Sequence, residues 1–128
     1  MGKINIIEKL LIRFLEFNSD KYYFLKYLPV NAKILDIGCG DCRRIKYRLC
    51  FRNDLIHYGI DLRKYESCSN FLTVFKKLDI TQNFLPFGKE EFDAVILSHI
   101  IEHLPASAFI NLLIEIRRVL KKGGYIYI

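Results

Sequence analysis

Two glycines and an acidic residue lie close together in the first third of the chain, and their spacing could position a ligand. Asp36 precedes Gly38 and Gly40, and the mostly apolar residues 33–37 predict a buried strand. Glycine accepts the positive φ values of a sharp turn and lets a ligand approach the backbone closely. Apolar residues at helical spacing follow: Cys42, Ile45 and Leu49. A strand, a glycine turn and a helix open a nucleotide-type site, because the first helical N–H groups point into the crevice beyond the strand.

The residues around the turn narrow the class of ligand. A dinucleotide site would need a third glycine where Arg43 stands, and a phosphate loop would need a Gly-Lys-Ser or Gly-Lys-Thr ending that the sequence does not have. The Asp36 carboxylate would repel a pyrophosphate but suits a cationic ligand. We therefore expect no nicotinamide site, and an incidental glycine turn in another α/β protein stays as the alternative.

A second acidic residue follows the next predicted strand. Residues 55–60 read as that strand, and it ends on Asp61. An acid at this place, about twenty residues past a glycine turn, is where a ribose is held by its hydroxyls. A carboxylate can accept two hydrogen bonds from a vicinal diol. The alternative is an aspartate that ends a strand or caps a helix.

Residues 35–40, Leu-Asp-Ile-Gly-Cys-Gly, resemble the first motif of the class I S-adenosylmethionine (SAM)-dependent methyltransferases. SAM carries a sulfonium and an ammonium group, which agrees with a carboxylate at Asp36. One departure is Cys42, where many family members have a third glycine. The resemblance covers residues 33–128 and implies SAM as the cofactor, with S-adenosylhomocysteine as its product.

Later segments resemble further motifs of the family. Its third strand ends in an acid that takes the adenine amino group, and the next residue packs on the ring; Asp79 and Ile80 match these positions. Residues 92–97 resemble the fourth motif, and Ser98 follows where the family lines the methionine end of the cofactor. The implied cofactor-binding residues are Asp36, Gly38, Cys39, Gly40, Asp61, Leu62, Asp79, Ile80 and Ser98.

The catalytic residue is not identified by the sequence. Methyl transfer needs a positioned nucleophile, and a general base only where that nucleophile must lose a proton. His99 and His103 are the candidate bases, because histidine titrates near neutrality, and either could equally be structural. His99-x-x-Glu102-His103 also resembles the metal-binding segment of small-RNA 3′-terminal 2′-O-methyltransferases. Too few ligands accompany it for a complete site, so we expect no metal.

The length of 128 residues predicts a single domain, residues 1–128, and the resemblance implies a three-layer Rossmann-like α/β fold for it. Leading helices at 4–17 and 21–28 occupy residues 1–29 and precede a SAM-binding core at 33–128. The resemblance implies five mainly parallel strands in the order 3-2-1-4-5, with helices on both faces. A helix from Pro105 to Lys122 should end at Gly123 and Gly124, before a fifth strand at 125–128.

The end of the fifth strand bears on partners. Family members normally continue beyond this strand, so we expect its edge to pair with a second copy or a partner protein, or the chain to be a piece of a longer enzyme. The net charge is +6, but Lys and Arg are spread over several segments, so nucleic-acid binding is only weakly supported.

Composition and cysteines suggest a compartment. No apolar run is long enough to span a membrane, and residues 1–9 are charged and lack the features of a signal peptide. The four cysteines do not resemble a secreted disulfide scaffold, and Cys39-x-x-Cys42 lacks the second half of a zinc site. We therefore expect small residues in a crowded turn there, and a reducing, cytoplasmic setting.

The function expected from these patterns is SAM-dependent methyl transfer to an acceptor that the sequence does not identify. The intact Asp36, Gly38, Gly40 and Asp61 favour a retained cofactor pocket. A non-catalytic role stays open, that of a SAM-binding or degenerate subunit that works with a partner. Metal-assisted methylation of an RNA ribose 2′-hydroxyl is a further alternative that rests on residues 99–103.

Overall fold

The computed structural model describes residues 6, 20–42, 52–70, 72–82, 84–97 and 99–128. The strands are β1 (Lys33–Ile37), β2 (Ile56–Asp61), β3 (Val74–Lys77), β4 (Phe92–Leu97) and β5 (Leu120–Tyr127). The α-helices are α2 (Asp20–Lys26) and α4 (Ala106–Val119), and two short 3-10 helices are η1 (Glu66–Asn70) and η2 (Ile101–His103). None of the helices within these ranges is long and apolar enough to cross a membrane.

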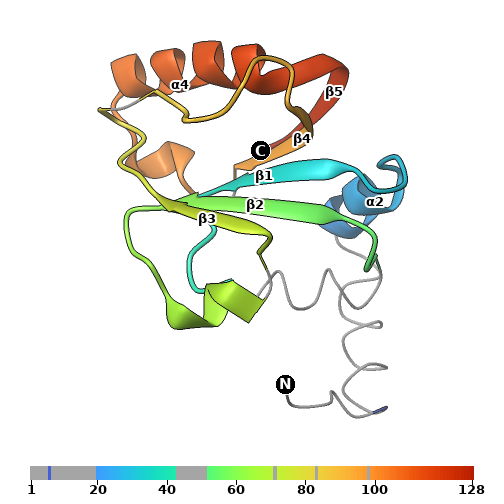
Figure 1. Ribbon diagram of the computed structural model, residues 1–128. Coiled ribbons are helices and arrows are strands. Elements are labelled where there is room, and N and C mark those ends of the chain that lie inside the picture. Colours follow the sequence, from blue (N-terminus) through green and yellow to red (C-terminus); the bar gives the residue numbers. More distant parts are fainter. Residues whose placement is uncertain (1–5, 7–19, 43–51, 71, 83, 98) are drawn as a thin grey trace.

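The five strands form one parallel sheet in the order β3-β2-β1-β4-β5 (Figure 1). β1 lies at its centre, where Ile34 is opposite His57 of β2 and Ala94 of β4. Ile34, Leu35 and Ile37 of β1 are fully buried, as expected for a parallel strand that is covered on both faces. The predicted Rossmann-like fold and strand order are confirmed.

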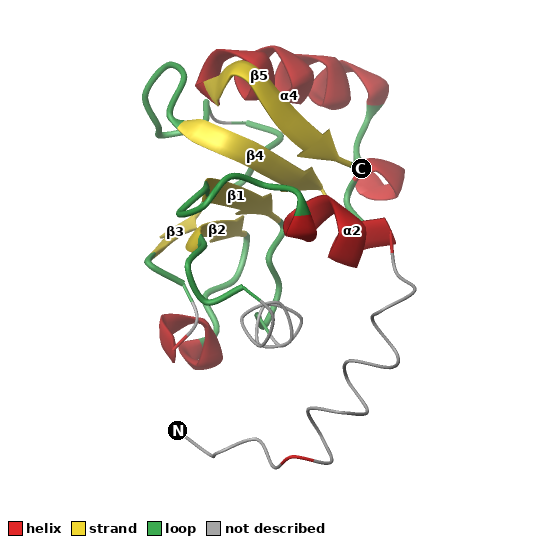
Figure 2. Ribbon diagram, turned by 90° about the vertical axis from the view of Figure 1, so that its right-hand side faces the viewer, coloured by secondary structure: helices red, strands yellow, loops and turns green. Residues whose placement is uncertain are grey.

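Alternate residues of the central strands face different helices. Leu35 and Ile37 belong to the core that includes Leu112 and Ile116 of α4. Ile34 belongs to a second core that includes residues of α2 and the turn after it, and the buried members of this core are Leu25, Leu28, Ala32, Ile34, Leu55, Ala94 and Ile96. α4 and α2 therefore cover opposite faces of the sheet (Figure 2).

Of the other predicted helices, one lies within the described residues and two lie largely outside them. The helix predicted at 21–28 is present as α2. The predicted helices at 4–17 and after the glycine turn fall largely on residues 7–19 and 43–51, which lie outside the described residues.

The boundary between α4 and β5 differs from the prediction. We expected the helix to continue to Lys122 and to end at Gly123 and Gly124. Instead α4 ends at Val119 and β5 begins at Leu120, so both glycines lie inside the strand.

Hydrogen bonds to the last helical carbonyls explain this boundary. The N–H of Glu90 donates to Arg118 O at 2.9 Å, and the N–H of Glu91 donates to Val119 O at 2.7 Å. The segment before β4 thus provides hydrogen-bond donors for the last carbonyl groups of α4, so the chain can enter the sheet directly after the helix. Gly123, with a φ of 73°, then lies where the pairing of β5 with β4 is irregular, which is a known use of glycine in strands.

Charged side chains join the amino ends of β1, β4 and β5. Lys33 Nζ donates to Glu91 Oε1 at 2.5 Å. Asp93 accepts from the backbone N–H of Lys33 at 2.8 Å and from Lys121 Nζ at 2.7 Å. The hydrogen bond from Lys33 lowers the pKa of Glu91, against the opposing effect of burial. We call Lys33, Glu91, Asp93 and Lys121 the amino-edge network.

Candidate functional site

The glycine turn follows the carboxyl end of β1 and is held by β2. The N–H groups of Gly38 and Cys39 donate to Ile60 O at 2.8 and 3.2 Å. The N–H of Gly40 donates to Asp61 Oδ2 at 2.9 Å. Gly38 and Gly40 have φ values of 71° and 58°, in the left-handed region that side chains resist. The sharp turn predicted from the two glycines is confirmed.

The two glycines differ in what surrounds them. A Cβ on Gly38 would lie 2.0 Å from Cδ1 of Ile100, so the Ile100 side chain packs directly on the turn. A Cβ on Gly40 would have no heavy atom of the described residues within 4 Å. As far as the described part of the chain shows, the space beside Gly40 is open, and it lies at the carboxyl edge where parallel α/β sheets bind their ligands.

Asp61 joins the second strand to this turn. Its Oδ2 accepts the N–H of Gly40, and its Oδ1 accepts the N–H of Arg63 at 3.1 Å. The side chain is half-buried, and each carboxylate oxygen has a further lone pair. Asp61 can therefore also accept hydrogen bonds from two hydroxyls of a ligand. Leu62 beside it is 58% exposed. The structure brings the acid and the turn together, and their role toward a ribose stays a prediction.

Asp36 lies inside the sheet, opposite Gly59 of β2 and Ile96 of β4, and is 3% exposed. Gly59 was not among the predicted site residues. A Cβ on Gly59 would lie 2.6 Å from Leu72 Cδ1 and 2.8 Å from Cys39 Sγ. Cys39 thus fills the space of a missing side chain, which holds the glycine turn close to β2. The signal in the sequence was a glycine inside a predicted strand, since such residues mark close approach.

Asp79 and Ile80 follow the end of β3. Asp79 Oδ1 accepts from the hydroxyl and the N–H of Thr81 at 2.6 and 2.9 Å, and these hydrogen bonds lower the pKa of Asp79. Ile80 packs against the core on the α4 side and lines a cavity of about 350 Å³ between the β3–β4 connection and α4. Neither the glycine turn nor Asp61 lines that cavity. The predicted contacts of Asp79 and Ile80 with adenine stay predictions.

The segment with the two histidines lies on the surface. The side chain of His99 is 71% exposed, and its Nδ1 lies 3.7 Å from Glu102 Oε1. His103 is exposed in η2. Among the described residues, the groups whose metal-binding atoms all lie within 4.8 Å do not include His99, Glu102 and His103. The structure therefore selects neither histidine as a base and adds no support for a metal there. Ser98 lies outside the described residues.

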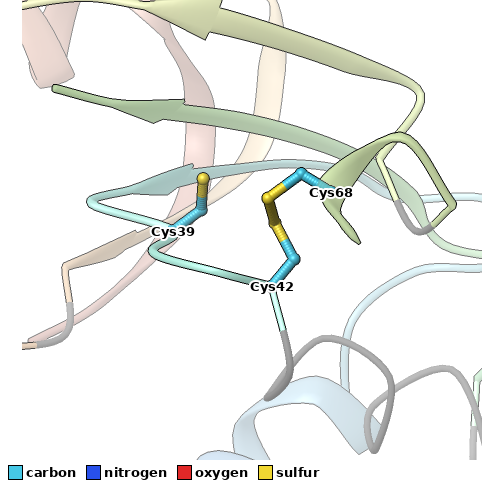
Figure 3. A group of neighbouring side chains, drawn as sticks. All are labelled: Cys39, Cys42 and Cys68. Carbon is cyan, nitrogen blue, oxygen red and sulfur yellow. A yellow bond between two sulfur atoms is a disulfide. The ribbon is translucent and has the colours of Figure 1, made fainter. Parts of the chain in front are cut away.

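Three cysteines meet beside the glycine turn (Figure 3). Cys42 and Cys68 form a disulfide, and Sγ of Cys39 lies within 4.8 Å of both sulfur atoms. We expected Cys39 and Cys42 to be only small residues in a crowded turn, which was wrong for Cys42, because it is bonded to Cys68. The reason is that η1 folds back on the turn, where Ser67 Oγ also donates to Asp41 O at 2.7 Å. The linear spacing of the cysteines contains no signal for this contact.

Cys42 also has an unusual backbone conformation. Its φ is 60°, a value that glycine adopts freely. For another residue the left-handed region costs roughly 1–2 kcal/mol. Many members of the resembled family have glycine at the position of Cys42. In this chain a cysteine side chain therefore occupies a backbone conformation that suits glycine.

Several solved structures with the same fold are methyltransferases, at low sequence identity to this chain. A SAM-dependent methyltransferase from Leishmania major has a TM-score of 0.67 and 19% identity, over 83% of this chain and 46% of that chain. A TehB-like SAM-dependent methyltransferase from Corynebacterium glutamicum has a TM-score of 0.65 and 21% identity, over 94% and 69%. A Haloferax volcanii methyltransferase, solved with the Trm112 methyltransferase activator, has a TM-score of 0.58 and 18% identity, over 94% and 55%. At these identities the likeness shows the fold, and the chain spans only part of the length of each.

No curated protein sequence matches the chain. The sequence does match a model that describes a protein family. The model described as "Methyltransferase domain" matches residues 35–128. This range begins in β1, includes the glycine turn and Asp61, and runs past the end of β5. Together with the parallel sheet order β3-β2-β1-β4-β5, the match shows that the chain belongs to the methyltransferase-domain family and has its class I, Rossmann-like fold.

Proposed function

We propose that this chain binds SAM at the carboxyl edge of its sheet and transfers the methyl group to an acceptor. The observation that carries the proposal is the hydrogen bond from Gly40 N–H to Asp61 Oδ2, at 2.9 Å. It joins a glycine turn that is open to a ligand to an acid whose oxygens have further lone pairs. The match to the methyltransferase domain supports methyl transfer as the class of reaction.

The residues at this edge fit a nucleoside with a cationic tail. The open space beside Gly40 admits a ligand against the backbone, and Asp61 can accept the hydrogen bonds of ribose hydroxyls. The buried carboxyl group of Asp36, two residues before Gly38, favours a positive charge near the turn. The further residues proposed to contact the cofactor are Leu62, Asp79, Ile80 and Ser98.

SAM, when bound, supplies a methyl group that is activated by the positive sulfur. The chain has to hold this donor, orient the acceptor in line with the methyl group and exclude water. Gly38 and Gly40 fix the backbone against which the donor lies, and Asp61 fixes its ribose. A general base is needed only where the acceptor must lose a proton, and His99 and His103 are the exposed candidates near this edge.

Titration calorimetry of SAM and S-adenosylhomocysteine into the chain tests the proposal. We expect micromolar binding, weakened about 10–100-fold in Asp61→Asn, because a hydrogen bond to a charged group contributes about 1.5–3 kcal/mol. Glu66→Gln is the matched control, since it removes the same charge from an exposed residue of η1 and should leave binding unchanged. An equal loss in both variants, or none in Asp61→Asn, would contradict the assignment of the site.

The alternative is a SAM-binding or degenerate subunit that works with a partner. One surface favours it: Ile126 and Ile114 are exposed and line one hollow where β5 lies beside α4, and β5 pairs only with β4 among the described strands. The similar Haloferax volcanii protein was solved with an activator protein. A chain that is monomeric by light scattering at high micromolar concentration and methylates an acceptor unaided would exclude this alternative. No binding of SAM at millimolar concentration would favour it.

A further inference from the structure

Three sulfur atoms and a backbone oxygen face one small region beside the glycine turn. Gly40 O lies 3.2 Å from Cys68 Sγ, 3.7 Å from Cys42 Sγ and 3.9 Å from Cys39 Sγ. While the disulfide is closed, Cys42 and Cys68 have no S–H to donate, so their contacts with this oxygen are not hydrogen bonds. Figure 3 shows the three side chains converging from the turn and from η1. The arrangement is a set of four donor atoms.

The burial of the three cysteines is suited to a closed site with one open side. Cys42 and Cys68 are each 1% exposed, and Cys39 is half-buried. Buried charged groups are paired or coordinate a metal, so thiolates at Cys42 and Cys68 would require a cation. The partial exposure of Cys39 provides the entry path that a metal site needs.

We propose that, once the disulfide is reduced, Cys39, Cys42 and Cys68 bind one thiophilic divalent cation of the Zn²⁺ class. Three thiolates, with Gly40 O or a water molecule in the fourth position, form a four-coordinate set of the kind that Zn²⁺ takes. In the sequence, Cys39-x-x-Cys42 is half of such a site. The fold supplies the next ligand from η1, through Cys68, rather than from a second Cys-x-x-Cys pair.

The cluster needs only a local rearrangement to hold the ion. Zn–S bonds of about 2.3 Å in a tetrahedral site place the sulfur atoms roughly 3.8 Å apart. The ligand atoms of the cluster already lie within 4.8 Å of one another. The Cα atoms of Cys42 and Cys68 are 5.2 Å apart. Rotation of these two side chains therefore suffices once their S–S bond is cleaved.

Cleavage of the disulfide and binding of the cation are separate, balanced steps. A phosphine, the disulfide and water give a phosphine oxide and two thiols; a dithiol gives the same two thiols and is itself oxidised to a disulfide. The cation then binds three thiolates and releases three protons, so its affinity rises with pH. The disulfide and the bound cation are thus alternatives at one site.

Anaerobic titration of the phosphine-reduced chain with Co²⁺ tests the proposal, because thiolate–cobalt charge-transfer absorption reports the ligands directly. We expect one Co²⁺ per chain, displaced by one Zn²⁺, and no such absorption in the chain with its disulfide intact. Cys39→Ser and Cys68→Ser should weaken binding more than about 100-fold, beyond the loss of an outer-shell partner. Ser69→Ala, which changes an exposed residue of η1 next to Cys68, is the control and should bind as the unchanged chain does.

Cys42→Gly is the variant that separates loss of a ligand from loss of the fold. Glycine suits the φ of 60° at this position, so this variant should remain folded by circular dichroism and still lose the cation. Binding that survives in Cys42→Gly or Cys68→Ser, or is equally strong in the oxidised chain, would overturn the proposal. So would an equal loss of binding in Ser69→Ala. None of these measurements depends on SAM, so the outcome is independent of the proposed methyl transfer.

Discussion

The two edges of the sheet use their acidic side chains in different ways. At the amino ends of the strands, Glu91 and Asp93 are bonded to lysine ammonium groups, Lys33 and Lys121. At the carboxyl ends, Asp61 accepts backbone N–H groups, and no lysine or arginine ion pair with it is present among the described residues. One edge neutralises its charges internally, whereas the other keeps a carboxylate available to a ligand.

This difference separates stability from binding. Ion pairs and hydrogen bonds among Lys33, Glu91, Asp93 and Lys121 join strands that are distant in sequence, which stabilises the fold. The glycine turn and Asp61 instead leave space for a ligand, and ordering the glycines costs backbone conformational entropy on folding. Substitutions at the amino edge should therefore change the free energy of unfolding, and substitutions at the carboxyl edge should change ligand affinity.

The largest effect on this comparison is expected from Gly40→Ala, with Gly123→Ala as its matched control. Both glycines have positive φ, 58° and 73°, and a Cβ would have no described heavy atom within 4 Å at either. Each substitution should therefore cost a similar 1–2 kcal/mol, roughly, of stability. Only Gly40→Ala places a methyl group in the proposed cofactor space, so SAM affinity should fall more than about tenfold in that variant alone, by calorimetry. Equal affinities in the two variants would remove Gly40 from the site.

A smaller effect, confined to stability, is expected from Asp93→Asn. Asp93 accepts from the Lys33 backbone N–H and from the Lys121 ammonium, and an amide offers only one oxygen for these two donors. Chemical denaturation should show a loss of about 1–3 kcal/mol, with SAM affinity unchanged. Lys121→Met, which removes the partly exposed ion pair alone, should cost about 1 kcal/mol or less. A change in SAM affinity in either variant would show that the two edges are coupled.

The smallest effect is expected in the pH dependence of Glu91→Gln. The pKa of Glu91 is lowered from its ordinary value of 4.5, first by the hydrogen bond from Lys33. A carboxyl group whose pKa is lower in the folded state stabilises the fold at pH values above its unfolded-state pKa. This stabilisation is lost as the pH falls through its folded-state pKa. At pH 7 the free energy of unfolding of the unchanged chain should be larger than that of Glu91→Gln by about 1 kcal/mol or less. This gap in stability should close below about pH 4.5. Thermal denaturation from pH 7 to pH 3 measures this gap.

The exposed neighbour Glu90 provides the control for that experiment. Glu90→Gln removes a charge one residue away, outside the amino-edge network. It should show no gap that closes with falling pH. A gap of the same size in both variants would attribute the effect to net charge rather than to Lys33.

The sheet could be predicted because local patterns decide it. Apolar runs at 33–37 and 92–97 are buried on both faces, and the strand order follows from the resemblance of the glycine motif to a known family. The pairing of the glycine turn with Asp61 was also foreseeable, since carboxyl ends of neighbouring parallel strands lie at one edge. The strands are signalled by apolar patterns that extend over several residues. The turn is signalled by glycines, which accept a backbone conformation that other residues resist.

The remaining features depend on contacts between distant residues. The helix α4 ends three residues before the predicted Lys122 because backbone groups of Glu90 and Glu91 bind its last carbonyls. Periodicity within the helix does not contain that information. The contact of Cys68 with Cys42 arises because η1 folds back on the turn. The close approach of Ile100 to Gly38 depends in the same way on a loop that has no repeating pattern.

The central position of β1 has a consequence for synthesis of the chain. Its Lys33 N–H is bonded to Asp93, which lies 60 residues later. A ribosome adding about 5–20 residues per second reaches that partner roughly 3–12 s after β1 has been made. During that time the apolar strand has no β4 beside it, and unpaired apolar strands are prone to aggregate. The central strand therefore stays exposed to aggregation until β4 has been made, although it belongs to the most buried part of the finished sheet.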